Sequence, residues 1–160
     1  MKIYVATDHA GFKLKEAIVP FVKKLGFDVQ DCGAHEYDPE DDYPDYIKKA
    51  AENVSLNSQK SLGIIFGGSG EGEAMVANKY PHVRATVYYG GKPEIVKLSR
   101  EHNDANMLSI GARFVDEKEA KEIVKTWLLG QYSVHERHKR RIEKIAILEK
   151  KSLWQILFRR

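Results

Sequence analysis

Short apolar segments of strand length alternate with longer segments of helical periodicity along the chain, and this alternation restricts the possible folds more than any other feature. The expected strands cover residues 2–7, 27–31, 61–66, 85–89 and 107–110. The expected helices cover residues 12–25, about 45–54, 93–102 and 116–129, and a further helix begins at about residue 73. Such an alternation predicts a parallel sheet with helices on both faces. We therefore expect an α/β protein with a three-layer α-β-α, Rossmann-like fold and a five-stranded parallel sheet.

The length and composition predict a single domain. A chain of 160 residues with 42% hydrophobic residues is long enough to bury one substantial core. We expect residues 1–148 to form this domain and residues 149–160 to form a C-terminal helical tail that is not a separate domain. Residues 153–158 are apolar at helical spacing, and we expect the tail to pack on a partner subunit rather than on a membrane.

Charge and cysteine content argue against several classes of function. The net charge of +3 is small beside 26 basic and 23 acidic residues, so the chain is not expected to bind nucleic acid or a membrane through its bulk charge. A single cysteine, Cys32, has no partner for an internal disulfide, and the first residues lack the apolar run of a signal peptide. No apolar stretch approaches the roughly 20 residues that span a bilayer. We expect a cytoplasmic protein.

Most of the unusual polar residues follow directly after the expected strands. Residues 8–11 read Asp-His-Ala-Gly, residues 67–73 form a glycine-rich loop, and Arg113 follows the last strand. Residues 102–104, His-Asn-Asp, precede that strand. Ligands of open parallel sheets bind outside the carboxyl ends of the strands, where loops and helix N-termini converge. The sequence therefore predicts a ligand site built from these loops.

The glycine-rich loop, GGSGEGE, follows an apolar strand and opens a helix, as an anion-binding nest of backbone N–H groups does. A Walker A loop needs Lys and Ser or Thr after Gly72, whereas Glu73 and Ala74 stand there, and Glu73 also replaces the last glycine of the dinucleotide fingerprint. Such a nest with a carboxylate above it suits a transient oxyanion. The alternative is a plain strand-to-helix turn with Glu71 and Glu73 as solvated acids of the first helical turn.

The other motifs have both a functional and a structural interpretation. Asp8 can cap a helix and leave His9 incidental, and the His102 segment can be a helix-end cap. Residues 135–141, HERHKRR, place Arg137 and Arg141 on one helical face, where they can bind a phosphate or be a solvated surface. Two histidines three residues apart on a helix fit a zinc site poorly, so we expect no metal.

Taken together and in order, five motifs resemble the ribose-5-phosphate isomerase B family, which also contains the galactose-6-phosphate isomerase subunits. The resemblance covers about residues 1–148. Its motifs are DHAG at 8–11, YPDY at 43–46, GSGEG at 68–72 running into ANK at 77–79, HNDAN at 102–106 and RHKRR at 137–141.

One departure from the family pattern concerns the catalytic base. Many members carry a cysteine just before the glycine loop, where this chain has Gly67, and Cys32 lies elsewhere and cannot replace it. A second branch, similar to the actinobacterial enzymes, has glycine there and uses a glutamate at the start of the next helix, which matches Glu73. The resemblance thus implies a glutamate base, which needs a dry environment to raise its pKa.

The resemblance also implies the remaining roles. Glu73 moves the proton between C2 and C1, His102 opens the sugar ring, and Ser69 and Asn103 assist at the enediolate. The sugar is held by Asp8, Tyr43, Gly68, Gly70, Glu71 and Gly72. The phosphate is held by His9, Arg113, Arg137, His138 and Arg141. No metal or organic cofactor is implied.

Part of the phosphate cluster comes from a neighbouring subunit in this family, which implies a homodimer with shared active sites, possibly paired into a tetramer. Ribose 5-phosphate and ribulose 5-phosphate are the expected substrate pair. An isomerase of allose 6-phosphate or galactose 6-phosphate stays open, because the sequence does not show the length of the pocket. Gly67 also leaves open a sugar-phosphate binder that has lost the chemistry together with the cysteine.

Overall fold

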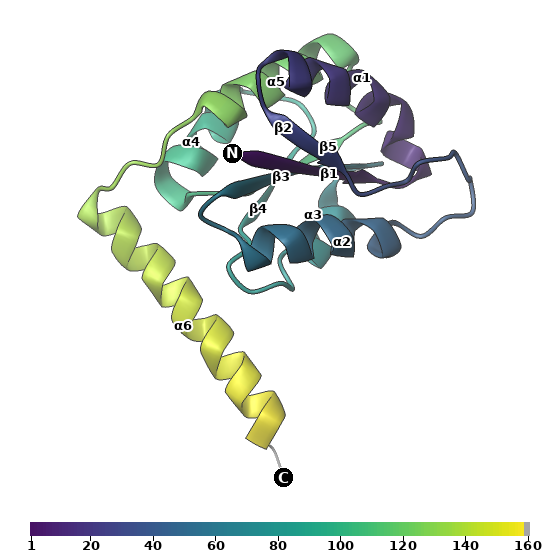
Figure 1. Cartoon of the computed structure of the whole chain (residues 1–160). Coiled ribbons are helices and arrows are strands. Elements are labelled where there is room, and N and C mark those ends of the chain that lie inside the picture. Colours follow the sequence, from purple (N-terminus) through teal and green to yellow (C-terminus); the bar gives the residue numbers. More distant parts are fainter. Residues whose placement is uncertain (159–160) are drawn as a thin grey trace.

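The computed structural model describes the backbone of residues 1–158 and the side chains of residues 1–150. Its five strands form one parallel sheet in the order β2-β1-β3-β5-β4 (Figure 1). The strands are β1 (Lys2–Thr7), β2 (Asp28–Asp31), β3 (Ser61–Gly67), β4 (Ala85–Tyr88) and β5 (Met107–Gly111). The expected α/β fold with a five-stranded parallel sheet is confirmed.

Helices cover both faces of the sheet and complete the three layers. The helices are η1 (His9–Gly11), α1 (Phe12–Lys24), α2 (Tyr43–Leu56), α3 (Glu71–Ala77), α4 (Glu94–Asn103), α5 (Glu117–Leu129) and α6 (Glu136–Phe158). Figure 1 shows α1 and α5 on one side of the sheet and α2 and α3 on the other. The first side holds a core that includes Ile18, Val96 of α4 and Trp127, and the second a smaller core around Ile47 and Val54.

The central strand β3 explains where the strand ends meet. All seven of its residues are buried, as expected for a parallel strand covered on both faces. It pairs with β1 on one side and with β5 on the other, so that Thr7 lies beside Phe66 and Gly67 beside Gly111. The loops that follow β1, β3 and β5 therefore leave the sheet at one edge.

The glycine-rich loop is shorter than the sequence predicted. Helix α3 begins at Glu71 instead of at about Glu73. Gly70 precedes it with a φ of 82°, in the left-handed region that glycine adopts without steric cost. This residue turns the chain sharply enough for Glu71 and Glu73 both to lie in the first helical turn.

The C-terminal helix α6 projects beyond the rest of the fold (Figure 1), and its middle part lies beside the loop before β4 and the helix α4. Ile145, Ile147 and Leu148 are exposed on it, and Glu149 accepts a hydrogen bond from the backbone N–H of His82 at 3.1 Å. The helix runs through residue 148 without a break, and the side chains of residues 153–158, for which packing on a partner was expected, lie outside those that the structure describes. Within the described residues, no helix is long and apolar enough to cross a membrane.

Candidate active site

The Glu73 carboxyl group lies inside the protein at the carboxyl edge of the sheet. Glu73 is only 4% exposed, although it belongs to the first turn of α3. Burial raises the pKa of Glu73 above the ordinary glutamate value, a backbone N–H hydrogen bond partly offsets this rise, and the nearby Asp8 carboxylate adds to it. Asp8 itself is 5% exposed. Two acidic side chains thus share one dry location, which favours the uncharged form of Glu73.

Gly67 makes room for this carboxyl group. A Cβ atom added at Gly67 would collide with both carboxylate oxygens of Glu73. The Glu73 side chain therefore occupies the space into which any other residue at position 67 would project. The two positions are sterically coupled, since a buried Glu73 in this rotamer requires glycine at the end of β3.

The loop between β3 and α3 is anchored to the end of β5. The hydroxyl of Ser109 donates to the Gly70 carbonyl at 2.6 Å, and the backbone N–H of Arg113 donates to the Gly68 carbonyl at 3.1 Å. At the start of α3, the Glu71 N–H donates to Oγ of Ser69 at 3.3 Å. The first N–H groups of a helix have no intrahelical acceptor, and here they face the same edge as Glu73.

Tyr43 and Arg113 cover two glycines of this loop. A Cβ added at Gly72 would lie 2.9 Å from the hydroxyl oxygen of Tyr43, the first residue of α2. One added at Gly68 would lie 3.3 Å from the guanidinium of Arg113. Glycine at 68 and 72 therefore lets a phenol and a guanidinium approach the loop backbone closely.

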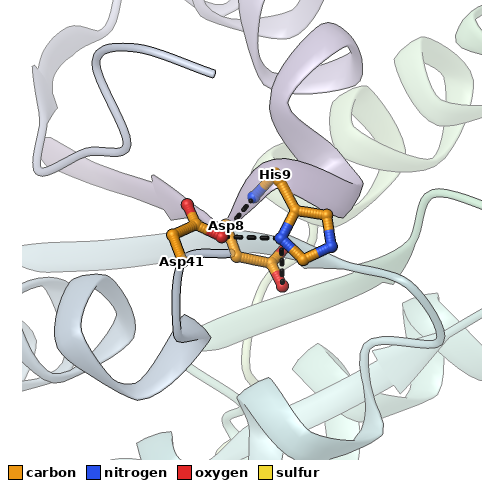
Figure 2. Close-up of side chains that lie close together, drawn as sticks. All are labelled: Asp8, His9 and Asp41. Carbon is orange, nitrogen blue, oxygen red and sulfur yellow. Dashed lines mark hydrogen bonds and ion pairs between the residues drawn. The ribbon is translucent and has the colours of Figure 1, made fainter. Parts of the chain in front are cut away.

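His9 is held by a carboxylate from a distant loop (Figure 2). Its Nδ1 lies 2.6 Å from Oδ1 of Asp41, and its backbone N–H donates to the same oxygen at 3.0 Å. The hydrogen bond with Asp41 is the main reason why the pKa of His9 is raised above 6.5. Asp8 caps η1 by accepting from the Ala10 N–H at 3.0 Å, so the structural interpretation of Asp8 holds beside any functional one.

Asp8, His9 and Asp41 also form a group whose ligand atoms lie within 4.8 Å of one another, as a metal site requires. The 2.6 Å separation of His9 Nδ1 from Asp41 Oδ1 is that of a charge-assisted hydrogen bond, which uses the nitrogen that would have to bind the ion. We interpret the group as an ion pair, and the absence of a metal stays a prediction.

A cavity of about 490 Å³ opens beside His9. Its polar lining comes from His9, Lys13, Tyr37, Arg113 and Glu117. Three of these side chains can carry positive charge and one carries negative charge. The cavity therefore suits an anionic group, and Arg113 links it to the glycine loop because its guanidinium also lies close to Gly68.

His102 and His138 lie together in a second cluster. Their ring centroids are 4.2 Å apart, and the Arg137 Nε–H donates to His138 Nε2 at 2.9 Å. Oγ of Ser133 lies 3.1 Å from the other ring nitrogen of His138. Burial, with the positive charges of His102 and Arg137, lowers the pKa of His138, so its imidazole is neutral near pH 7. Arg137 and Arg141 themselves are exposed.

This second cluster lies at the opposite edge of the sheet from Glu73. Helix α4 runs antiparallel to the strands and ends at Asn103, just before β5 begins at Met107. Gly111, at the other end of β5, pairs with Gly67 beside Glu73. The five residues of β5 separate the two edges by roughly 13 Å, at about 3.3 Å for each step along the strand. The expectation that residues 102–104 join the other loops is therefore not met within one chain, because the direction of α4 carries them away.

The family model for ribose/galactose isomerases matches residues 3–145. The chain belongs to this family. Ribose-5-phosphate isomerase B of Mycolicibacterium paratuberculosis is 40% identical over 150 residues, which cover 94% of this chain and 92% of the relative. The resemblance found in the five motifs is thus confirmed.

Two solved structures of the ribose/galactose isomerase family are similar over almost the whole chain. Ribose-5-phosphate isomerase B from Mycoplasma genitalium, a crystal structure with bound ribulose-5-phosphate, is 39% identical with a TM-score of 0.89 and covers 93% of this chain and 96% of that one. The enzyme from Clostridium thermocellum is 41% identical with a TM-score of 0.88 and covers 95% of this chain and 99% of that one. The isomerase fold therefore extends over both clusters.

Two residues beside the candidate site, Asp41 and Lys13, were not singled out by the sequence reasoning. Asp41 is one of several acids in residues 35–44, and nothing in the sequence distinguishes the one that contacts His9. Lys13 reads as a polar residue of the amphipathic α1, but its position in the first turn places it at the cavity. A positive charge four residues after His9 was the only available signal.

We predict that Gly67→Ala lowers kcat about tenfold or more, because the new methyl group displaces the Glu73 carboxyl group from its position. The expected change in Tm is small, since the end of a flexible side chain can move aside. Steady-state kinetics and thermal unfolding of the purified variant test this. Gly26→Ala, which has nothing within 4 Å of the added Cβ but a positive φ, serves as a control for backbone strain. Activity unchanged by Gly67→Ala would contradict the steric coupling.

Proposed function

We propose that the protein is an aldose–ketose isomerase that interconverts ribose 5-phosphate and ribulose 5-phosphate through an enediolate, without a metal or organic cofactor. The observation that carries the proposal is the buried Glu73 carboxyl group above Gly67, next to a loop of helix N-terminal N–H groups. The names of the relatives support this substrate pair. We further propose that the enzyme acts in the cytoplasm.

In this proposal Glu73 is the base that takes the proton from C2 and returns it to C1. A raised pKa suits this step, because a carboxylate whose pKa lies closer to neutral pH is a stronger base. The developing enediolate oxygen is stabilised by backbone N–H groups of residues 69–72, a contribution that grows as charge develops on the substrate. Ser69 orients the substrate or the base, and Gly68, Gly70 and Glu71 complete the cradle.

Asp8 and Tyr43 hold the hydroxyl groups of the sugar in this proposal. Asp8 is buried and close enough to Glu73 for its charge to raise the pKa of that carboxyl group, and Tyr43 lies against Gly72. His102 donates a proton to the ring oxygen to open the furanose, and Asn103 assists at the enediolate. Since both lie at the other edge of the sheet in their own chain, they must reach the substrate from a second copy.

We therefore propose a homodimer in which each active site combines the Glu73 edge of one chain with the His102 edge of its partner. The partner also supplies Arg137, His138 and Arg141, which join His9 and Arg113 around the phosphate. Bidentate arginine contacts fix a phosphate in position and direction, so C1 and C2 are placed against Glu73. Exposed Ile145, Ile147 and Leu148 on the extended α6 give a subunit contact an apolar surface. Dimers can pair further into tetramers.

We predict that kcat/KM for ribose 5-phosphate exceeds that for allose 6-phosphate and for galactose 6-phosphate about tenfold or more. The reason is that one extra carbon between the reacting end and the phosphate disturbs the placement of C1 and C2. Isomerisation rates on the three substrates, measured with and without a chelator, test the proposal. Unchanged rates with chelator are expected. A preference for a six-carbon substrate would make the protein an isomerase of allose 6-phosphate or galactose 6-phosphate. No turnover of any of the three would favour a non-catalytic sugar-phosphate binder.

A further inference from the structure

Asp41 makes contacts that no step of the proposed chemistry uses. It lies 32 residues from His9 in the sequence, yet one of its oxygens accepts from the backbone N–H of His9 and lies 2.6 Å from Nδ1 of the ring. The Asp41 side chain is 4% exposed. Its other oxygen is buried without a hydrogen-bond partner among the described residues. A buried carboxylate this poorly solvated requires a cation close by, and the His9 ring is in direct contact.

The contact also fixes the direction of the ring. With Nδ1 turned toward Asp41, Nε2 lies on the far side of the imidazole, and His9 is 27% exposed toward solvent. His9 lines the cavity that Lys13 and Arg113 also line. The rings of His9 and Tyr37 form an edge-to-face pair with centroids 6.5 Å apart. The imidazole is thus held on one side by a carboxylate and on the other side borders a cationic cavity.

We propose that Asp41 is a positioning residue that keeps His9 protonated and directs its Nε2–H toward the phosphate of the substrate. This inference rests on the proposed function, because it gives the cavity a phosphate to bind. Asp41 does not touch the substrate. It acts through His9, which thereby becomes a cationic donor and not a neutral imidazole of undefined tautomer.

Several charged groups face His9, and together they raise the pKa of its imidazole. The Asp41 hydrogen bond raises the pKa of His9 most, burial lowers it, and the charge of Asp8 at 4.0 Å raises it. The positive charge of Arg113 lowers it. Lys13 and Glu117 line the same cavity with opposite charges. Since the pKa is raised above 6.5, the imidazolium persists to a higher pH, and phosphate affinity is lost as the pH rises through the raised value.

Asp41→Asn tests this role, because it keeps the size and a carbonyl acceptor but removes the charge. The first readout is the pKa of the His9 ring, followed by NMR in the full-length dimer and assigned with a His9→Gln variant. The second is the Kd of inorganic phosphate across the pH range. We expect the His9 pKa to fall in Asp41→Asn, and the Kd to rise about tenfold at a pH where the ring is protonated in the wild type but neutral in the variant. As the pH is lowered until the ring is protonated in both proteins, the two Kd values should converge.

Matched variants separate this role from a purely structural one. Asp42→Asn removes the same charge from the next residue, which is exposed and makes no side-chain cap contact, and it should leave both readouts unchanged. Asp41→Glu should restore most of the lost affinity. In the enzyme assay, Asp41→Asn should raise KM for ribose 5-phosphate more than it lowers kcat.

An unshifted His9 pKa in Asp41→Asn, or a loss of phosphate affinity equal at every pH, would overturn the proposal. Both measurements are made without turnover. A wild-type protein that failed to isomerise ribose 5-phosphate would therefore contradict the proposed function, while the titration and the phosphate affinity would still decide the role of Asp41.

Discussion

Glu73→Gln is expected to lower kcat for ribose 5-phosphate about 100-fold or more while changing KM little. Glutamine has nearly the same shape, so it occupies the space above Gly67 and leaves the substrate-binding loops in place. It cannot accept the C2 proton, because a neutral amide is a very weak base. Steady-state kinetics in both directions measure the effect.

The controls for Glu73→Gln address the alternative base and the integrity of the fold. Cys32→Ser should retain full activity, because burial raises the pKa of the Cys32 thiol to about 11 and leaves it uncharged at neutral pH.

The raised pKa of the Glu73 carboxyl group in the folded state means that folding favours its acid form, so the stability of the wild type falls as pH rises through that pKa. Glu73→Gln should therefore have a Tm at neutral pH at least equal to that of the wild type. Activity unaffected by the substitution would mean that another group moves the proton.

The fold could be predicted from the sequence because each element carries a local signal. The apolar run of β3 and the period of α1 and α5 determine the strand–helix alternation, and that alternation leaves few arrangements other than a parallel sheet. Glu73 and Gly67 could be singled out because they match one branch of the family, and only five residues lie between them in one strand–turn–helix segment. The sequence did not predict the contact between the Glu73 carboxyl group and the position of a Cβ at residue 67, because that contact depends on the rotamer of a buried side chain.

The remaining parts of the site depend on contacts between distant segments. The sequence contains several acids between residues 38 and 42, and only the path of the loop brings Asp41 and not Asp42 onto His9. His102 was expected among the strand exits because it lies near a strand in the sequence. A helix that returns antiparallel to the strands ends at the opposite edge, and the position of His102 follows from that direction.

If each active site is divided between the two chains of a dimer, two inactive variants should restore activity when they are combined in a mixed dimer. Glu73→Gln chains and His102→Ala chains are each expected to retain at most about 1% of wild-type activity as homodimers. Mixed dimers formed by refolding them together in equal amounts should recover about a quarter of it. In a mixed dimer, one site combines the intact Glu73 edge with the intact His102 edge, while the other site carries both substitutions. Random pairing makes half of the dimers mixed, each with one active site.

The recovery depends on which edges form a site, so a matched pair of variants serves as the control. Glu73→Gln mixed with Gly67→Ala places both defects at the same edge, and no mixed dimer of these chains contains an intact Glu73 edge beside Gly67. That mixture should show no activity above the average of its two homodimers. Separately tagged chains allow the mixed dimer to be purified and its share of the sample measured. If the Glu73→Gln and His102→Ala mixed dimer formed but remained inactive, each site would have to be built within one chain, and the proposed exchange of His102 between subunits would be wrong.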